Sequence, residues 1–173
     1  MRILLAVIAT ITLLALAGLG LLFSGIYNVA ATDRHSDLGA WVLSTAMRRS
    51  VEYHASAQPF DARLAQQDTK QGFAEFNEKC VQCHGAPGRD RGEIGKGLRP
   101  RAPRLTDASR RWTDAQLFWI IKFGVKMTGM PAFGETHDDS RILNIVAFVK
   151  TLHGMTAAQY RELEEDRNLH HHH

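Results

Sequence analysis

The stretch Cys80-Val81-Gln82-Cys83-His84 decides how this chain of 173 residues is interpreted. Two cysteines three residues apart lie on one face of a helical turn, so that both sulfurs reach the same side. The histidine that follows brings an imidazole nitrogen to the same place. The spacing Cys-x-x-Cys-His is typical of the covalent attachment of haem c. We therefore expect Cys80 and Cys83 to hold one haem through thioether bonds and His84 to bind its iron.

Three other uses of the cysteine pair fit the rest of the chain less well. A zinc site needs two more ligands in a compatible arrangement, and the chain has no further cysteine. A dithiol redox pair of the thioredoxin type belongs in an alternating strand and helix pattern, which this sequence does not show. A lone structural disulfide in an oxidising compartment stays open as an alternative.

A second candidate ligand lies in an extended loop well after the cysteine motif. Iron bound to one histidine has a vacant sixth position, and methionine sulfur is its usual soft ligand. Met130 stands between Gly129, which permits close approach of the backbone, and Pro131, which stiffens the loop. We therefore expect Met130 to be the second axial ligand. Met127 is the rival ligand, and the further alternative is that both methionines fill gaps in the core.

The start of the chain predicts a membrane helix. Ile3 to Phe23 is apolar and uncharged, and at about 1.5 Å per residue it spans roughly 31 Å, the thickness of a bilayer core. The hydrophobic part of a signal peptide is usually shorter, about 7–15 residues, although Val29-Ala30-Ala31 is a passable cleavage site. We expect residues 1–31 to be a single-pass anchor, or an uncleaved signal, in the cytoplasmic membrane of a bacterium. Arg2 and the terminal amine are the only positive charges before the span. By the positive-inside rule they stay in the cytoplasm, so the rest of the chain is expected in the periplasm.

Residues 32–67 predict a helix followed by a linker. Ser36 or Asp37 can cap a helix in which Leu38, Trp41 and Val42 recur at helical spacing. Such a helix lies either at the membrane surface, or against the following domain or an oligomer partner. Gln58-Pro59-Phe60 breaks the pattern, and a linker is expected from Phe60 to Gln67.

The sequence predicts an all-α domain over residues 68–155. Asp68 or Thr69 can cap a first helix that runs to Cys80, with Gly72 leaving room for Phe148 of another helix. Thr113 and Gln116 form a capping box for a second helix, which Gly124 ends. Asp138, Asp139 and Ser140 are N-cap types that open a final amphipathic helix, and His153-Gly154 ends it.

Two further stretches, one inside this domain and one after it, show weaker patterns. The glycine- and arginine-rich segment 85–105 predicts a loop around the cofactor, with Leu98 and Leu105 as its inward anchors. A carbonyl near Pro100 or Pro103 is expected to accept the second imidazole N–H of His84. Residues 156–173 are expected to be a charged tail, in which Thr156 to Asn168 predicts a frayed helix and His170 to His173 have no assigned function.

Composition excludes several other classes of protein. Charged residues make up 23% and apolar residues 45%, an ordinary globular composition behind an apolar start. A formal charge of +3 is too small to indicate a nucleic-acid partner. No glycine loop that cradles phosphate and no catalytic constellation is visible. No small-molecule substrate is therefore expected.

Residues 69–154 resemble a class I cytochrome c domain. The resemblance rests on the haem motif, on Gly129-Met130-Pro131-Ala132-Phe133, and on matching residues in the flanking segments, namely Gly72, Phe76, Leu105, and Phe148 to Leu152. It implies an all-α fold that encloses one haem c, with His84 proximal and Met130 distal. The nearest likeness is to membrane-anchored monohaem cytochromes and to haem c subunits of bacterial respiratory complexes. The chain departs from the family at Phe148, where Trp or Tyr is common, and in its arginine-rich loop.

The resemblance implies an electron carrier rather than an enzyme. We expect it to pass one electron at a time between redox protein partners of respiratory or dehydrogenase type. Ten Lys and Arg against four Asp and Glu between Arg89 and Lys126 favour partners with acidic docking surfaces. A solvated basic face without a partner is the alternative. The other functions considered are a fixed haem c subunit of a larger membrane oxidoreductase and a gas-binding haem sensor with an open iron site.

Overall fold

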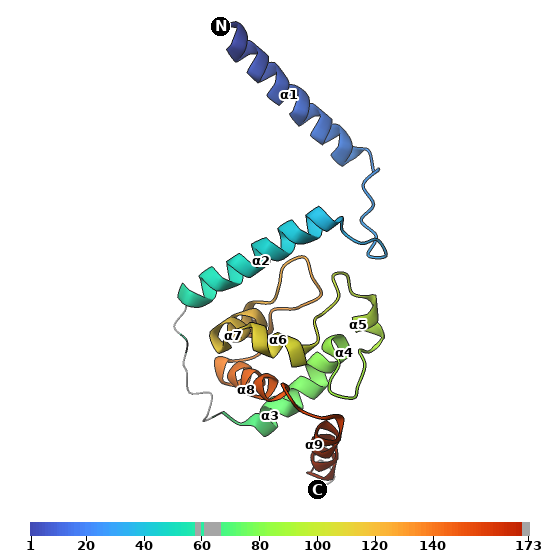
Figure 1. Ribbon diagram of the computed structural model, residues 1–173, viewed down its shortest axis with the longest axis vertical. Coiled ribbons are helices and arrows are strands. Elements are labelled where there is room, and N and C mark those ends of the chain that lie inside the picture. Colours follow the sequence, from blue (N-terminus) through green and yellow to red (C-terminus); the bar gives the residue numbers. More distant parts are fainter. Residues whose placement is uncertain (58–59, 61–66, 171–173) are drawn as a thin grey trace. The chain divides into compact units, whose positions relative to one another are not determined.

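The regular structure of this chain is helical. A computed structural model describes residues 1–57, 60 and 67–170, and no β-strand occurs within these ranges. The helices, with η2 a π-helical and η3 a 3-10 turn, are α1 Arg2–Phe23, α2 Asp37–Ala57, α3 Thr69–Glu75, η2 Phe76–Cys80, α4 Val81–His84, α5 Glu93–Gly97, α6 Leu105–Arg111, α7 Asp114–Phe123, η3 Phe133–Glu135, α8 Asp139–Thr151 and α9 Ala157–His170 (Figure 1). The all-α fold expected from the sequence is therefore confirmed.

The chain divides into two compact units, Met1–Asp33 and Arg34–His173. The first unit contains α1, which buries none of its 22 residues. Among the described residues α1 is the one helix long and apolar enough to cross a membrane, a test that a signal sequence also passes. A helix of this kind suits lipid because its backbone hydrogen bonds are satisfied internally.

The second unit is built on the contact between α3 and α8. The Asp68 carboxylate accepts hydrogen bonds of 2.9 and 3.1 Å from backbone N–H groups of the first turn of α3, which confirms the predicted cap. Gly72 lies so close to α8 that a Cβ there would stand 2.0 Å from the carbonyl oxygen of Asn144. The same Cβ would be 3.0 Å from the Cβ of Phe148, so the predicted Gly72–Phe148 contact is confirmed.

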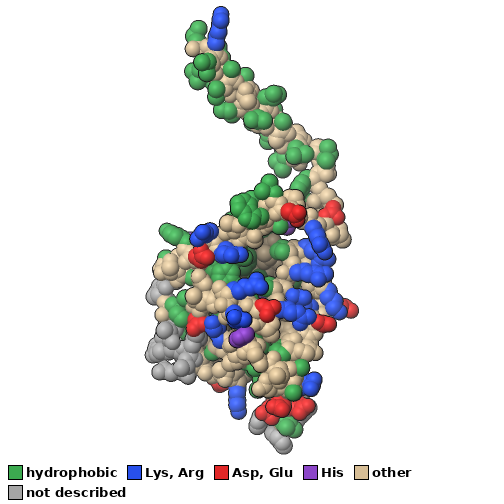
Figure 2. Space-filling model, in the orientation of Figure 1, with side chains coloured by type: hydrophobic (Ala, Val, Ile, Leu, Met, Phe, Trp, Pro, Cys, Tyr) green, Lys and Arg blue, Asp and Glu red, His purple; other side chains and the backbone are tan. Residues whose placement is uncertain are grey.

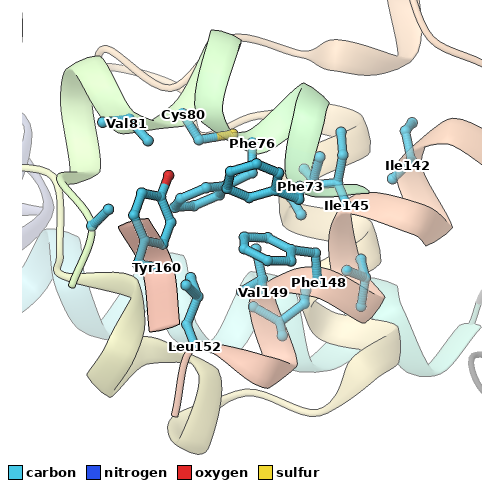
Figure 3. Packing of buried hydrophobic residues seen from close by; sticks show 14 residues of the cluster. Phe73, Phe76, Cys80, Val81, Ile142, Ile145, Phe148, Val149, Leu152 and Tyr160 are labelled. Carbon is cyan, nitrogen blue, oxygen red and sulfur yellow. The ribbon is translucent and has the colours of Figure 1, made fainter. Parts of the chain in front are cut away.

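Four aromatic rings form the centre of the core (Figure 3). Phe73 and Phe76 come from the first helical run, Phe148 from α8 and Tyr160 from α9, and each is at most 4% exposed. Phe73 meets Phe148 at 5.3 Å and Tyr160 at 5.5 Å between ring centroids, edge to face in both cases. This arrangement pairs the positive ring edge with the negative ring face and adds about 0.5–1.5 kcal/mol per pair to the burial of apolar area.

The structure corrects the expectation that the C-terminal segment frays. Tyr160 of α9 is 1% exposed, and its hydroxyl donates a 3.0 Å hydrogen bond to Oδ1 of Asn77. Arg89 spans from the same Asn77 to Glu164 of α9, with a 2.7 Å contact to the carboxylate. Tyr160 is a single aromatic side chain in a charged helix. One residue does not make an apolar periodicity, so the sequence did not predict this packing.

The second correction concerns the segment 85–105. It was expected to lack regular structure, but it contains α5, and α6 begins at its end. Helices of five and seven residues are too short for a helical period to be recognised among glycines and prolines. Most of the predicted linker from Phe60 to Gln67, and the histidines at 171–173, lie outside the described residues.

The helix predicted after the membrane segment packs on the same unit. Ser36 Oγ accepts a 3.2 Å hydrogen bond from the backbone N–H of Gly39 and so caps α2. Towards the other end of α2, Val51 and Ala55 are buried. The interpretation of this segment as a helix packed against the following domain is therefore confirmed for the C-terminal half of α2.

Candidate functional site

Cys80 and Cys83 lie at the end of one continuous helical run. α3 passes through the π-helical turn η2 into α4, so the predicted helix reaches Cys80, but with one wider turn. Such turns are frequently found at functional sites. Both cysteines are free thiols, Cys80 buried and Cys83 half-buried.

The Cys80 thiol is poorly suited to dithiol or zinc chemistry. Burial raises the pKa of Cys80 to about 12, and the Cys83 thiol and the Glu75 carboxylate add to the rise. A thiol that ionises so reluctantly is a weak nucleophile and a weak zinc ligand, because both roles need the thiolate. Across the described ranges, no group of three or more His, Cys, Asp or Glu is arranged to hold a metal ion.

His84 is held with one ring nitrogen committed and the other left available. The side chain is 9% exposed, and its Nδ1 lies 2.8 Å from the carbonyl oxygen of Pro103. A carbonyl oxygen can only accept, so the proton is on Nδ1 and the lone pair is on Nε2. Burial lowers the pKa of His84; the Pro103 carbonyl opposes this effect and Arg91 adds to it. A neutral imidazole with a free Nε2 is the form that binds metals.

Met130 and Met127 have opposite surroundings in the same loop. Met130 is half-buried and packs against the hydrophobic core, whereas Met127 is 78% exposed and has a positive φ of 61°. The backbone N–H of Val125 donates to the carbonyl of Met130 at 3.2 Å, and the N–H of Met130 donates to Thr128 Oγ1 at 3.1 Å. These bonds close the loop so that Met130, and not its rival, lies against the apolar interior.

The segment after the cysteine motif wraps back over it. A Cβ on Gly95 would lie 2.5 Å from the carbonyl oxygen of Gln82 and 2.8 Å from the Cα of Cys83, so only glycine permits this approach. Of the two predicted anchors, Leu105 packs on the core and Leu98 lies against Gly129 of the methionine loop. The loop therefore joins both halves of the candidate site.

Arg91 supplies an observation that tests whether a charged cofactor fits here. Its Nη2 donates a 2.7 Å hydrogen bond to the carbonyl of Ala102, while its Nε is buried and has no hydrogen-bond partner. Buried polar groups are normally satisfied, so an unsatisfied guanidinium N–H indicates a missing acceptor. A haem propionate is an acceptor of the right charge. The free cysteines, the available Nε2 and the half-buried Met130 fit the same cofactor.

Comparison with known proteins agrees with this chemistry. Residues 67–149, just under half of the chain, match the family described as cytochrome c oxidase, cbb3-type, subunit III. That family is a cytochrome c domain, so residues 67–149 are similar to a domain of this kind. No curated protein and no solved structure matches the chain significantly. The match supports the resemblance to c-type cytochromes, and a domain of this kind suggests haem-based electron transfer.

The cytochrome domain also contains a polar cluster that sequence reasoning missed. Glu75 Oε2 lies 3.2 Å from Nε2 of His137, and Glu75 Oε1 accepts from Nε of Arg141 at 3.0 Å. The side chains of Glu75 and His137 are only 12% and 6% exposed. Burial alone would raise the pKa of Glu75, but the hydrogen bonds from Arg141 and His137 outweigh it and lower that pKa.

The cluster joins α3 to the segment that follows the methionine loop. His137 lies two residues after the end of η3, and its ring centroid is 5.4 Å from that of Phe133. Only a loop and a helix cap were predicted at this place. Asp138 does cap α8, by accepting from the N–H of Arg141 at 2.8 Å. The only trace of this cluster in the sequence is the carboxylate of Glu75 in α3. Its partners His137 and Arg141 lie more than 60 residues later in the chain, so the sequence does not pair them.

Proposed function

We propose that this protein is a membrane-anchored electron carrier with a single haem c. In this proposal Cys80 and Cys83 hold the haem through thioether bonds, while Nε2 of His84 and the sulfur of Met130 are the iron ligands. The observation that carries the proposal is the hydrogen bond from Nδ1 of His84 to the Pro103 carbonyl, which leaves a buried, neutral imidazole ready to bind metal beside two free thiols.

The bound haem supplies a one-electron couple between ferric and ferrous iron. The chain's own residues set the surroundings of that couple. The Pro103 carbonyl orients His84 and fixes its tautomer. Met130 brings a thioether that favours the ferrous state, and Arg91 offers its unsatisfied N–H to a propionate. If His84 and Met130 both bound the iron, no position would be left on it for a substrate, which would favour a carrier over an enzyme.

The proposed setting is the outer face of a bacterial cytoplasmic membrane. α1 is the anchor, and the cytochrome domain lies in the periplasm. Its partners are a redox protein donor and a redox protein acceptor with acidic docking surfaces. Lys and Arg side chains gather over the segment that carries α5 and the loop after it (Figure 2), and they attract such surfaces.

Covalent attachment is the first property to test. The full chain, produced in a bacterium that has the haem c maturation machinery, should keep its colour after acid–acetone extraction. The double variant Cys80→Ala, Cys83→Ala should lose it. A redox titration of the wild type should fit a one-electron couple. A folded wild-type protein with a colourless pellet would overturn the proposal.

A second candidate function is that of a fixed haem c subunit in a larger membrane oxidoreductase. The family match favours it, because the family is named for a subunit of a cbb3-type oxidase. Extraction of native membranes with mild detergent, followed by size exclusion, separates the two. A free carrier elutes alone, whereas a subunit elutes in a complex of fixed stoichiometry.

A further inference from the structure

One face of α2 is fixed to the cytochrome domain. In the C-terminal half of the helix, Val51 and Ala55 are 1% and 5% exposed. His54 stacks on Trp119 of α7, with ring centroids 5.7 Å apart and planes 10° from parallel. The helix is therefore a packed part of its unit, and its direction relative to α7 is set by these contacts.

A second apolar face occupies the N-terminal half of the same helix. Leu38, Trp41 and Val42 are 70%, 64% and 47% exposed, and together with Thr45 they recur at the spacing i, i+3, i+4, i+7. At 3.6 residues per turn this stripe is turned roughly 110° from the packed face. Hydrophobic side chains are visible on the outer surface of α2 (Figure 2). No described residue outside α2 covers the stripe.

The position of α2 in the chain indicates what covers this stripe. Residues 24–36 join the end of α1 to the start of α2. Thirteen residues extend at most about 47 Å at roughly 3.6 Å each, so α2 stays near any membrane that holds α1. Trp is enriched at membrane interfaces, and Leu and Val favour the acyl boundary below. The charged residues of α2 are two arginines and two carboxylates, so α2 has no net charge to attract a charged protein partner.

We propose that the N-terminal half of α2 lies in the interfacial layer of the same bilayer that holds α1, with Leu38, Trp41 and Val42 inserted. This inference rests on the proposed function for the retention of α1 as an anchor, and its test also uses the thioether attachment of Cys80 and Cys83. Since the other half of α2 is packed on α7, the insertion gives the cytochrome domain a second attachment. The domain then has one preferred orientation towards the membrane instead of rotating freely on a linker.

Spin labelling of the full-length holoprotein tests the inference. The chain has only two cysteines, and in the holoprotein both form thioethers, so an introduced cysteine is labelled alone. Three variants are compared in nanodiscs of zwitterionic lipid. Thr45→Cys lies within the stripe, Ser50→Cys is an exposed control on another side of α2, and Leu13→Cys reports on the anchor. Collision of the nitroxide with oxygen and with a water-soluble nickel chelate is measured for each.

The label at position 45 should collide more with oxygen and less with the nickel chelate than the label at position 50. The difference should be unchanged at high salt, because α2 is neutral overall. If position 13 reports lipid while positions 45 and 50 both report water, the inference is wrong and the anchor stands. If position 13 also reports water, the anchor fails and the inference fails with it. Dipolar broadening at position 45 would mean that a second copy covers the stripe, which also overturns the inference.

Discussion

Met130 and Met127 are three residues apart in the same loop, yet only Met130 packs against the core. If Met130 is the sulfur ligand, Met130→Leu keeps the side-chain volume and removes the ligand. We expect loss of the methionine–iron charge-transfer band and a reduction potential lower by on the order of 0.1 V, within the ~0.8 V range that axial ligands command. Visible spectra and a redox titration measure both effects.

Met127→Leu is the matched control, since it makes the same chemical change at an exposed position. It should leave the band and the potential unchanged. Carbon monoxide should bind rapidly to reduced Met130→Leu and slowly, or not at all, to the wild type and to the control. Rapid binding to the wild type would instead indicate an open iron site and favour the sensor.

Glu75 predicts a pH dependence of stability. Its pKa is below the ordinary 4.5 because Arg141 and His137 donate hydrogen bonds to the carboxylate. The folded state therefore favours the charged form, and this stabilisation is present above about pH 4.5 and is lost as the pH falls through the folded pKa. Glu75→Gln should unfold at lower denaturant concentration than the wild type at pH 7. The difference should shrink on acidification to pH 4 and below.

Glu78→Gln is a suitable control for this experiment, because Glu78 lies in the same helical run with its side chain 64% exposed. Its difference from the wild type should be small at both pH values. A difference for Glu75→Gln that stays constant from pH 7 to pH 4 would show that the cluster does not titrate as described.

The chemistry of single residues was predictable where a residue's role depends on its near neighbours. The bond from His84 to Pro103 was expected because a metal-binding imidazole needs an acceptor and the proline loop follows within 20 residues. Arg91 and the cluster of Glu75, His137 and Arg141 were not expected. Their roles depend on which distant charges share a buried space, and only the packing of α3 against α8 decides that.

At the scale of whole helices, a contact between two helices could be predicted where a glycine makes room for a neighbouring helix. Gly72→Ala should test the contact between α3 and α8, since the new Cβ would stand 2.0 Å from a backbone carbonyl that cannot move like a side chain. Overpacking costs about 1–3 kcal/mol, and we expect the upper end of this range in the free energy of unfolding. Denaturant titration of the holoprotein measures it.

Gly97→Ala provides the comparison, because nothing lies within 4 Å of a Cβ at that position. It should remain within about 0.5 kcal/mol of the wild type, as is usual for surface substitutions. Equal stability of the two variants would mean that α3 and α8 can separate at little cost, contrary to the contact described here.

Helices that begin with a capping side chain were predicted from the sequence, and helices without such a cap were not. Asp68, the capping box at Thr113 and Gln116, and Asp138 each satisfied N–H groups of a first turn, so α3, α7 and α8 began where predicted. α5 and α6 have no side-chain cap. The packing of α9 depends on Tyr160 filling a space between Phe73 and Phe76, which is a property of the assembled core.

In the proposed function, charge and membrane anchoring of the whole molecule both affect the encounter with a redox partner. A carrier tethered to a membrane meets its partners in two dimensions, and the segment from Arg89 to Lys126 carries ten basic against four acidic residues. Part of this charge is used internally, as in the 2.8 Å ion pair of Arg104 with Asp90. Arg101 and Lys126 are exposed, and neither forms an ion pair with another residue that the structure describes. Such cations are available to steer an anionic partner.

Electron exchange with small charged oxidants tests this steering without knowledge of the natural partner. Oxidation of the reduced protein by anionic hexacyanoferrate(III) should slow as salt is added, whereas oxidation by a cationic cobalt(III) tris-phenanthroline should not. Arg101→Glu should slow the anionic reaction several-fold at low salt and flatten its salt dependence. Lys70→Glu makes the same change of charge at the exposed start of α3 and should have a smaller effect. Equal effects of the two variants would mean that net charge alone, rather than a basic surface beside the haem, controls the encounter.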